Sequence, residues 1–323
     1  MNILVTGGAG YIGSHFVRKL LVNNHQVIVL DNLSRGHAES IPSEAIFIKQ
    51  DILDFNGLNK NLQNLEIDVI VHFAAFAYVG ESVENPSLYY TNNVAGSLNL
   101  IKAAIQNNIK KFVFSSTCSV YGNPETIPIS EDEPTKPINP YAHTKLMIEQ
   151  ILNDFDKAYN LKYVALRYFN AAGASTDGKI GESHYPEPHL IPLVIKTLLG
   201  EREKIFIYGD DYETPDGTCI RDYIHVNDLA DAHLKAIQFL DGGKSGVFNL
   251  GTGRGYSVKE IIETAEKIAG VKINAEITKR RPGDPAVLVA NNKKAADILG
   301  WNPKFNLEDI ILTAYKWHKN PKF

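Results

Sequence analysis

Two side chains four positions apart are the first sign of chemistry in this sequence. Tyr141 and Lys145 follow Asn139-Pro140, a pair that is typical of a helix start, with Asn as the N-cap and Pro in the first turn. Residues four apart share one face of a helix, so the ammonium group of Lys145 would lie near the phenol. A nearby positive charge lowers the pKa of a phenol from about 10. The pair therefore predicts a tyrosine base that works near neutral pH.

The same spacing occurs again at Tyr315 and Lys319, so the spacing alone does not identify the base. In a chain of this length and composition, roughly one Tyr-x-x-x-Lys match is expected by chance. Context separates the two matches. Tyr141 comes after a polar stretch, Ser115-Ser116-Thr117, at the end of an expected strand, and it follows a complete dinucleotide-binding pattern.

That pattern opens the chain. An apolar run over residues 3–5 leads into Gly7, Gly10 and Gly13, and an amphipathic helix is expected from about Tyr11. Glycines allow positive φ and let the backbone touch a pyrophosphate, while the start of the helix offers unpaired N–H groups. The spacing is typical of the first βα turn of a Rossmann fold.

An acidic residue follows at the position that this fold predicts. Asp31 ends the second expected strand and is placed to accept hydrogen bonds from an adenosine ribose. Its charge would repel a 2′-phosphate, so we expect NAD as the cofactor. Arg35 is the one residue that argues for NADP.

Short apolar runs alternate with helical stretches through the first half of the chain, which predicts an α/β fold with a doubly wound parallel sheet. Such sheets bind ligands at the carboxyl ends of their strands. The residues at these ends are therefore candidates for ligand contacts: Asp51, Ala74, Ala75, Ser115, Ser116, Thr117 and Asn170.

The pattern changes near residue 171, where proline and glycine become frequent and strands become sparse. We assign residues 1–171 to an NAD-binding Rossmann domain and residues 172–323 to a smaller α/β lobe that binds the substrate. A helix capped by Asn227 and a strand over residues 247–250 are expected, so the chain should return to the first sheet at about 226–251.

Composition excludes several classes of function. The chain has 323 residues, of which 44% are apolar, and this is ample for a packed core. A net charge of −4 provides no basic field to hold nucleic acid or an anionic membrane. No apolar run approaches the ~20 residues that span a bilayer, and the early first strand leaves no room for a signal peptide. We expect a cytoplasmic protein.

No metal site is expected. Cys118 and Cys219 are too few for a structural zinc site or a disulfide framework, which fits a reducing compartment. His184 and His189 lie in a proline-rich loop without a helical or Cys/His pairing pattern.

Several motifs occur together in the order that is typical of a known family. They are Thr6-Gly7-x-x-Gly10-x-x-Gly13, Ser115-Ser116-Thr117, Tyr121-Gly122 and Tyr141-x-x-x-Lys145. In these the chain resembles the extended short-chain dehydrogenase/reductase family. Five further segments are similar to its UDP-glucose 4-epimerase branch: residues 72–75, 79–82, 166–170, 221–226 and 280–284. The resemblance covers essentially the whole chain and implies a homodimer that uses NAD to interconvert UDP-galactose and UDP-glucose in galactose metabolism.

The resemblance also implies residue roles. Tyr141 would accept the proton, Lys145 would hold the nicotinamide ribose, and Thr117 would bond the sugar. The positions that match NAD contacts are Gly7, Gly10, Tyr11, Ile12, Gly13, Asp31, Asn32, Leu33, Ser34, Arg35, Gly36, Asp51, Ile52, Phe73, Ala74, Ala75, Phe76, Ala77, Asn92, Thr117, Tyr141, Lys145 and Phe169. Those that match contacts to the nucleotide sugar are Thr117, Tyr141, Asn170, His189, Leu190, Phe206, Ile207, Tyr208, Arg221, Arg281, Pro282, Gly283, Asp284 and Leu288.

These residues suit the implied reaction. Inverting a hydroxyl-bearing carbon requires oxidation to a ketone and reduction from the opposite face, so the sugar must turn between the two steps. Binding should therefore reside in the nucleotide. Arg221 and Arg281 are placed to clamp a diphosphate and leave the hexose free to swing.

Two positions depart from the family pattern, because Ala77 stands where some members carry Lys and His189 where Asn is common. Leu288 stands where hexose-restricted members carry Tyr and permissive ones carry Cys, unless it simply faces the core. The open alternatives are a 4-epimerase of UDP-N-acetylglucosamine or of a UDP-pentose, a nucleotide-sugar dehydratase and a silent NAD-binding regulator. The dehydratase usually carries Asp-Glu directly after the Thr, where this chain has Cys118-Ser119.

Overall fold

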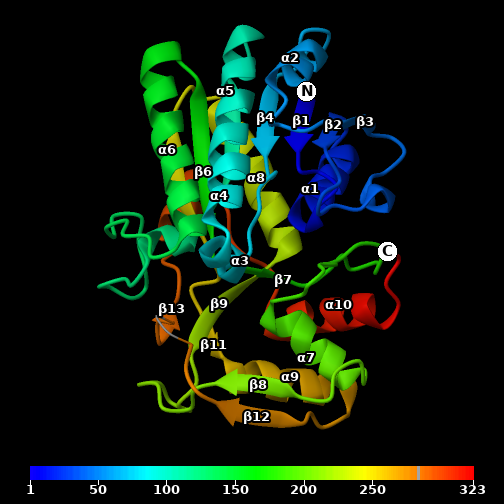
Figure 1. Ribbon diagram of the computed structural model, residues 1–323, viewed down its shortest axis with the longest axis vertical. Coiled ribbons are helices and arrows are strands. Elements are labelled where there is room, and N and C mark those ends of the chain that lie inside the picture. Colours follow the sequence, from blue (N-terminus) through cyan, green and yellow to red (C-terminus); the bar gives the residue numbers. More distant parts are fainter. Residues whose placement is uncertain (282–283) are drawn as a thin grey trace.

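The computed structural model describes residues 1–281 and 284–323 (Figure 1). Its largest sheet has seven strands, all parallel. Across the sheet they are β10 (Gly246–Leu250), β6 (Lys162–Tyr168), β5 (Lys111–Thr117), β4 (Val69–His72), β1 (Asn2–Thr6), β2 (Gln26–Asp31) and β3 (Ile46–Lys49). The doubly wound α/β fold that the sequence predicts is thereby confirmed.

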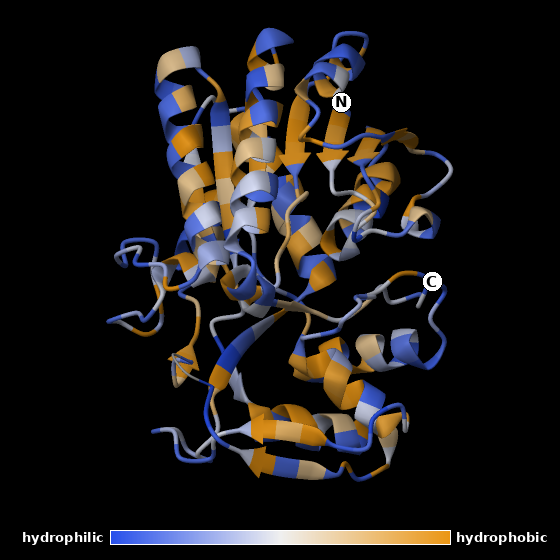
Figure 2. Ribbon diagram, viewed as in Figure 1, coloured by the Kyte–Doolittle hydropathy of each residue, from blue (hydrophilic) through white to orange (hydrophobic). Residues whose placement is uncertain are grey.

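Helices cover both faces of this sheet, and the strand pleat determines which residues meet them. In β1, Ile3 and Val5 belong to the core under α1 and α8, whereas Leu4 belongs to the core under α2, α5 and α6. This alternation buries both faces, as expected of a parallel sheet, and the strands are mostly apolar in Figure 2. The helices are α1 (Tyr11–Val22), α8 (Val226–Leu240), α2 (Phe55–Leu62), α5 (Gly96–Gln106) and α6 (Pro140–Tyr159).

A smaller lobe packs below the carboxyl ends of these strands (Figure 1). In one sheet β9 pairs with β11, β13 and β7, and in a second β8 pairs with β12. Three helices, α7, α9 and α10, share an apolar core with β7, β8, β9 and β11. The elements are β7 (Asn170–Ala172), β8 (Ile205–Tyr208), β9 (Ile220–His225), β11 (Gly255–Ser257), β12 (Ala275–Thr278), β13 (Val287–Leu288), α7 (Leu190–Leu198), α9 (Val258–Ala269) and α10 (Leu307–Lys319).

Short helical segments connect these elements. They are η1 (Ala38–Ser40), α3 (Val79–Glu84), α4 (Pro86–Tyr89), η2 (Tyr90–Ala95), η3 (Cys118–Tyr121) and η4 (Ala295–Leu299). Among the described residues, no helix is both long and apolar enough to cross a bilayer.

The chain returns to the large sheet late, because α8 packs against α1 and β10 pairs with β6. The N-cap expected for α8 was wrong. His225 is the last extended residue of β9, and its Nδ1 accepts the N–H of Asn227 at 3.0 Å. His225 is therefore the cap, and Asn227 lies inside the first turn of the helix.

Candidate active site

A continuous cleft follows the carboxyl ends of the large sheet and continues into the smaller lobe. Its central hollow, of about 280 Å³, shares Gly7, Gly10 and Phe73 with a hollow toward β2. On the other side it shares Leu190 and Tyr223 with a hollow among β8, β9 and the start of α7. A long ligand, or two ligands placed end to end, would therefore contact both lobes.

The glycine turn after β1 forms one wall of the cleft without side chains. Gly7 has φ +71°, and a Cβ there would collide with the backbone of Ala74. A Cβ on Gly13 would collide with the carbonyl oxygen of Gly7. Helix α1 then begins at Tyr11 with no side-chain cap. Its first N–H groups have no partner within the helix, which suits an anion such as a pyrophosphate.

Asp31 is held rigidly at the end of β2. Its carboxylate accepts the N–H of Ala9 at 3.0 Å and the N–H of Leu33 at 2.8 Å. Burial raises the pKa of Asp31, while the two backbone hydrogen bonds oppose this shift. The carboxylate lines the hollow nearest β2, at the position that the fold uses to bind a ribose.

Arg35 lies in the same region, but a carboxylate already neutralises its charge. Its Nη2 donates to both oxygens of Glu81, at 2.7 and 3.0 Å. The guanidinium also lies 5.1 Å from the centre of the Phe76 ring and 4.8 Å from that of Tyr78. Since Arg35 is engaged in this way, the structure weakens the single argument for NADP.

Tyr141 and Lys145 lie on the first turns of α6, in the central hollow. Asn139 caps this helix by accepting the N–H of Ala142 at 2.9 Å, as the sequence predicts. The Lys145 side chain is buried, and its Nζ donates to the carbonyl oxygen of Ser115 at 2.8 Å. The same Nζ lies 5.9 Å from the centre of the Tyr141 ring. The helix therefore brings ammonium and phenol together at the end of β5.

The expected pKa shift of the phenol was wrong for the protein alone. Burial raises the pKa of Tyr141 to about 12, with the neighbouring Thr117 hydroxyl acting in the opposite direction. Burial also lowers the pKa of Lys145 to about 7, while the charge of Glu149 opposes that shift. Spacing fixes the distance between the two groups, but the loss of solvent dominates both pKa values.

A buried ion pair connects α6 to the large sheet. Arg167 on β6 donates to the Glu149 carboxylate through Nε at 3.0 Å and Nη2 at 2.6 Å. Its Nη1 donates to the Tyr121 hydroxyl at 2.8 Å, and the Ser116 hydroxyl donates to Glu149. These bonds tie α6 to β5 and β6, and so fix the position of Lys145.

The hollow in the smaller lobe carries the positive charge. Arg221 on β9 and Arg281 both line it. Arg221 forms an ion pair with Asp284, and the guanidinium of Arg281 lies 4.0 Å from the centre of the Tyr208 ring. Arg202 lines the same hollow, so its guanidinium groups outnumber the one carboxylate, Asp284, even with Arg221 paired to it. Such a set suits a diphosphate, and an aromatic ring beside it suits a flat base.

The sequence profile of the NAD dependent epimerase/dehydratase family matches residues 3–251. The chain belongs to this family. One curated relative, a UDP-glucose 4-epimerase of Halalkalibacterium halodurans, is 54% identical over 99% of this chain and 96% of its own length. The family that the sequence motifs predict is thereby confirmed.

Solved structures of the family superpose closely on this chain. The UDP-glucose 4-epimerase of Bifidobacterium longum, solved with NAD+ and UDP, is 41% identical with a TM-score of 0.94, and the match covers 99% of both chains. The UDP-Glc/GlcNAc 4-epimerase of Campylobacter jejuni is 45% identical with a TM-score of 0.88, covering 98% of this chain and 99% of that one.

The cleft fits the dinucleotide that the family uses. The glycine turn leaves no Cβ in the way of a pyrophosphate, and of the two hollows that share this turn one is lined by Asp31 and the other by Lys145. The residues present are thus those that NAD requires along its length.

Most of the residues that the sequence assigned to NAD or substrate line the cleft. Those in the central hollow are Gly7, Gly10, Tyr11, Ile12, Gly13, Arg35, Phe73, Ala75, Ala77, Thr117, Tyr141, Lys145, Phe169, Asn170, His189 and Leu190. Those toward β2 are Asp31, Asn32, Ser34, Gly36, Ile52, Ala74, Phe76 and Asn92. Those in the smaller lobe are Phe206, Tyr208, Arg221, Arg281 and Asp284.

Four assigned residues do not line these hollows, and two others, Pro282 and Gly283, lie outside the described residues. The Asp51 carboxylate instead accepts the Nδ2–H of Asn32 at 2.9 Å. The other three are Leu33, Ile207, whose side chain packs into the core of the smaller lobe, and Leu288, which packs beside the apolar cluster that contains Phe169. A contact of these residues with a ligand stays a prediction.

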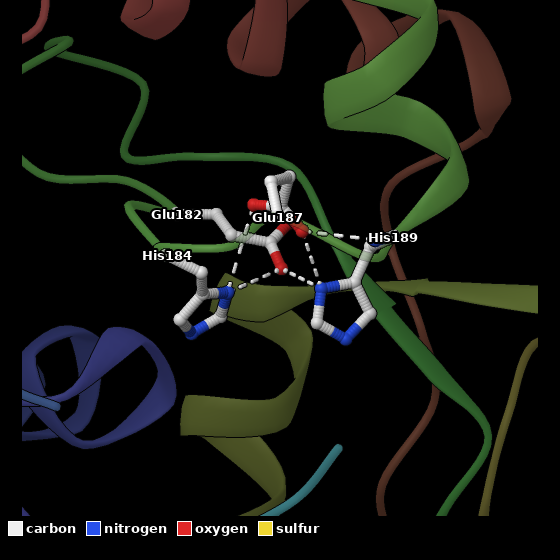
Figure 3. A group of neighbouring side chains, drawn as sticks. All are labelled: Glu182, His184, Glu187 and His189. Atoms are coloured by element: carbon white, nitrogen blue, oxygen red, sulfur yellow. Dashed lines mark hydrogen bonds and ion pairs between the residues drawn. The ribbon is translucent and has the colours of Figure 1, made fainter. Parts of the chain in front are cut away.

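Sequence reasoning missed a cluster of four side chains in the wall of the cleft (Figure 3). We name Glu182, His184, Glu187 and His189 the Glu–His cluster. All four come from the segment between β7 and α7, and their nearest ligand atoms lie within 4.8 Å of one another. The spacing Glu-x-His-x-x-Glu-x-His was visible in the sequence, but only the fold of the loop shows that the side chains converge.

Proposed function

We propose that the protein is a UDP-glucose 4-epimerase that interconverts UDP-galactose and UDP-glucose. The observation that carries this proposal is the place of Tyr141 and Lys145, which lie between the glycine turn and the hollow that contains Arg221 and Arg281. A base at this junction would meet a sugar whose nucleotide is bound in the smaller lobe. The full-length identity with UDP-glucose 4-epimerases supports the same substrate.

The residues would divide the reaction among them. Tyr141 would act as a base in its deprotonated form, the phenolate taking the proton of the sugar C4 hydroxyl, and Thr117 would hold that hydroxyl by a hydrogen bond. Bound NAD would supply the hydride acceptor and return the hydride to the transient ketone. Lys145 would hold the nicotinamide ribose beside the base.

Arg221 and Arg281 would hold the diphosphate in bidentate fashion, leaving the sugar free to present its other face. Binding energy then resides in the part of the substrate that does not react. This division permits inversion at C4 with no net oxidation.

A coupled assay that detects UDP-glucose tests the proposal. Purified protein should convert UDP-galactose to UDP-glucose with no NAD added, because we expect it to retain bound NAD. Absence of turnover, both with and without added NAD, would refute the epimerase assignment.

A second substrate deserves the same assay. The similar protein of Campylobacter jejuni is a UDP-Glc/GlcNAc 4-epimerase, and this chain carries Leu288 where hexose-restricted members carry tyrosine. We propose that UDP-N-acetylglucosamine is also epimerised. We further propose a cytoplasmic homodimer with the domain boundaries given above.

A further inference from the structure

The four side chains of the Glu–His cluster point toward one another, so that four possible metal-ligand atoms converge (Figure 3). The Nδ1 of His189 lies 2.8 Å from an oxygen of Glu182 and 2.7 Å from one of Glu187. The Nδ1 of His184 lies 3.2 Å from the same Glu182 oxygen and 3.6 Å from the second oxygen of Glu187. Both imidazoles thus direct the same ring nitrogen toward two carboxylates.

Hydrogen bonds within the cluster do not satisfy all of these atoms. Within the described residues, the Nδ1 of His184 and the Oε2 of Glu187 are buried and have no hydrogen-bond partner. The Glu187 side chain is only 3% exposed, and the Glu182 side chain only 5%. Two buried carboxylates side by side require compensating positive charge, and the unpartnered oxygen among them keeps its lone pairs available for another ligand.

The required charge is two positive units, which two imidazolium groups or one divalent cation would supply equally. In the protein alone, the Nδ1 atoms of both imidazoles lie within ion-pair distance of the Glu182 carboxylate. A divalent ion in place of two imidazolium charges would leave the net charge of the cluster unchanged. Burial of the carboxylates therefore does not oppose the exchange.

We propose that the Glu–His cluster is a binding site for one divalent transition-metal ion, with Zn²⁺ as its representative. Two imidazole nitrogens and two carboxylates form a four-ligand set that Zn²⁺ accepts, whereas Mg²⁺ and Ca²⁺ prefer oxygen ligands alone. Each His donates through Nδ1, and each Glu through one oxygen.

The ion would cross-link residues 182–189, a short loop in the wall of the cleft. The carbonyl oxygen of Glu182 accepts the indole N–H of Trp317 on α10 at 2.9 Å, which holds the first end of the segment. The second end, His189, leads directly into α7 at Leu190. Glu182, His184 and His189 all line the central hollow, so metal binding would stiffen a wall of the cleft.

Metal binding is measured on the purified full chain after removal of bound metal with a chelator. Zn²⁺ is then titrated in competition with a chromogenic chelator. We expect one Zn²⁺ per chain in the wild type. His184→Gln and Glu187→Gln should each weaken binding by at least about tenfold, because each removes one ligand. His25→Gln, in the turn before β2, removes an imidazole outside the cluster and should leave binding unchanged.

Visible absorption of the Co²⁺ form provides a second measurement. The wild type and His25→Gln should give the bands of a four-coordinate ion, and both cluster variants should lose them. If the wild type takes up no stoichiometric Zn²⁺, or if the cluster variants bind it as tightly as wild type, the proposal is refuted and the cluster is an ion-pair network only. Neither measurement involves epimerisation, so failure here is distinct from failure of the proposed function.

Discussion

Replacing Tyr141 with phenylalanine removes one hydroxyl from the centre of the cleft. The ring is retained, and the Thr117 hydroxyl is the neighbour that lowers the pKa of the phenol against the effect of burial. Loss of one hydrogen bond would cost only about 0.5–1.5 kcal/mol, and the variant no longer buries a phenol hydroxyl, so the fold should persist. Loss of a general base lowers a rate by about 10²-fold or more, equivalent to about 2.7 kcal/mol of transition-state stabilisation. Turnover of UDP-galactose should therefore fall at least about a hundredfold.

Tyr315→Phe is the matched control. The Lys319 ammonium lies 5.9 Å from the centre of the Tyr315 ring, the same separation as in the proposed catalytic pair. Tyr315 lies on α10 and does not line the cleft. We expect its variant to keep the wild-type rate. Retention of more than about a tenth of the rate by Tyr141→Phe, with thermal unfolding near that of wild type, would refute the assignment of the base.

Three further results are expected. Denatured protein should release NAD, because Asp31 would repel a 2′-phosphate and Arg35 is already paired; NADP(H) in the extract would contradict this. Arg167→Leu leaves the Glu149 carboxylate buried without its cation and should cost about 3–5 kcal/mol in denaturant unfolding, whereas a loss below about 1 kcal/mol would mean that water reaches the carboxylate. Leu288→Tyr should lower turnover of UDP-N-acetylglucosamine relative to UDP-galactose about tenfold, and an unchanged ratio would place Leu288 away from the sugar.

The sequence predicted the large sheet well because its signals are local. Apolar runs of strand length alternate with amphipathic helices, and the glycine turn has a steric requirement that no other residue meets. The Asn139 cap of α6 was predictable for the same reason. The cap of α8 was not, because the N-cap is His225, a residue type that is not typical of caps, while the Asn that is typical of them lies two residues later.

The electrostatics were less predictable, because they depend on burial. The spacing of Tyr141 and Lys145 gives their distance, but it does not show that both side chains are buried. Burial raises the pKa of Tyr141 and lowers that of Lys145, so it favours the neutral form of each. The Glu–His cluster was missed for a related reason. Its four residues lie in a loop, where sequence periodicity carries no information on which side chains converge.

The distribution of charge along the cleft would let a protein with net charge −4 attract the anionic substrate proposed above. Arg202, Arg221 and Arg281 outnumber Asp284 in the hollow of the smaller lobe, and the N-terminus of α1 adds its dipole at the glycine turn. The two buried carboxylates of the Glu–His cluster, beside the central hollow, would repel a diphosphate if they were uncompensated. Two imidazolium groups or one divalent ion remove that repulsion, so the cluster must hold positive charge for the cleft to accept its ligand.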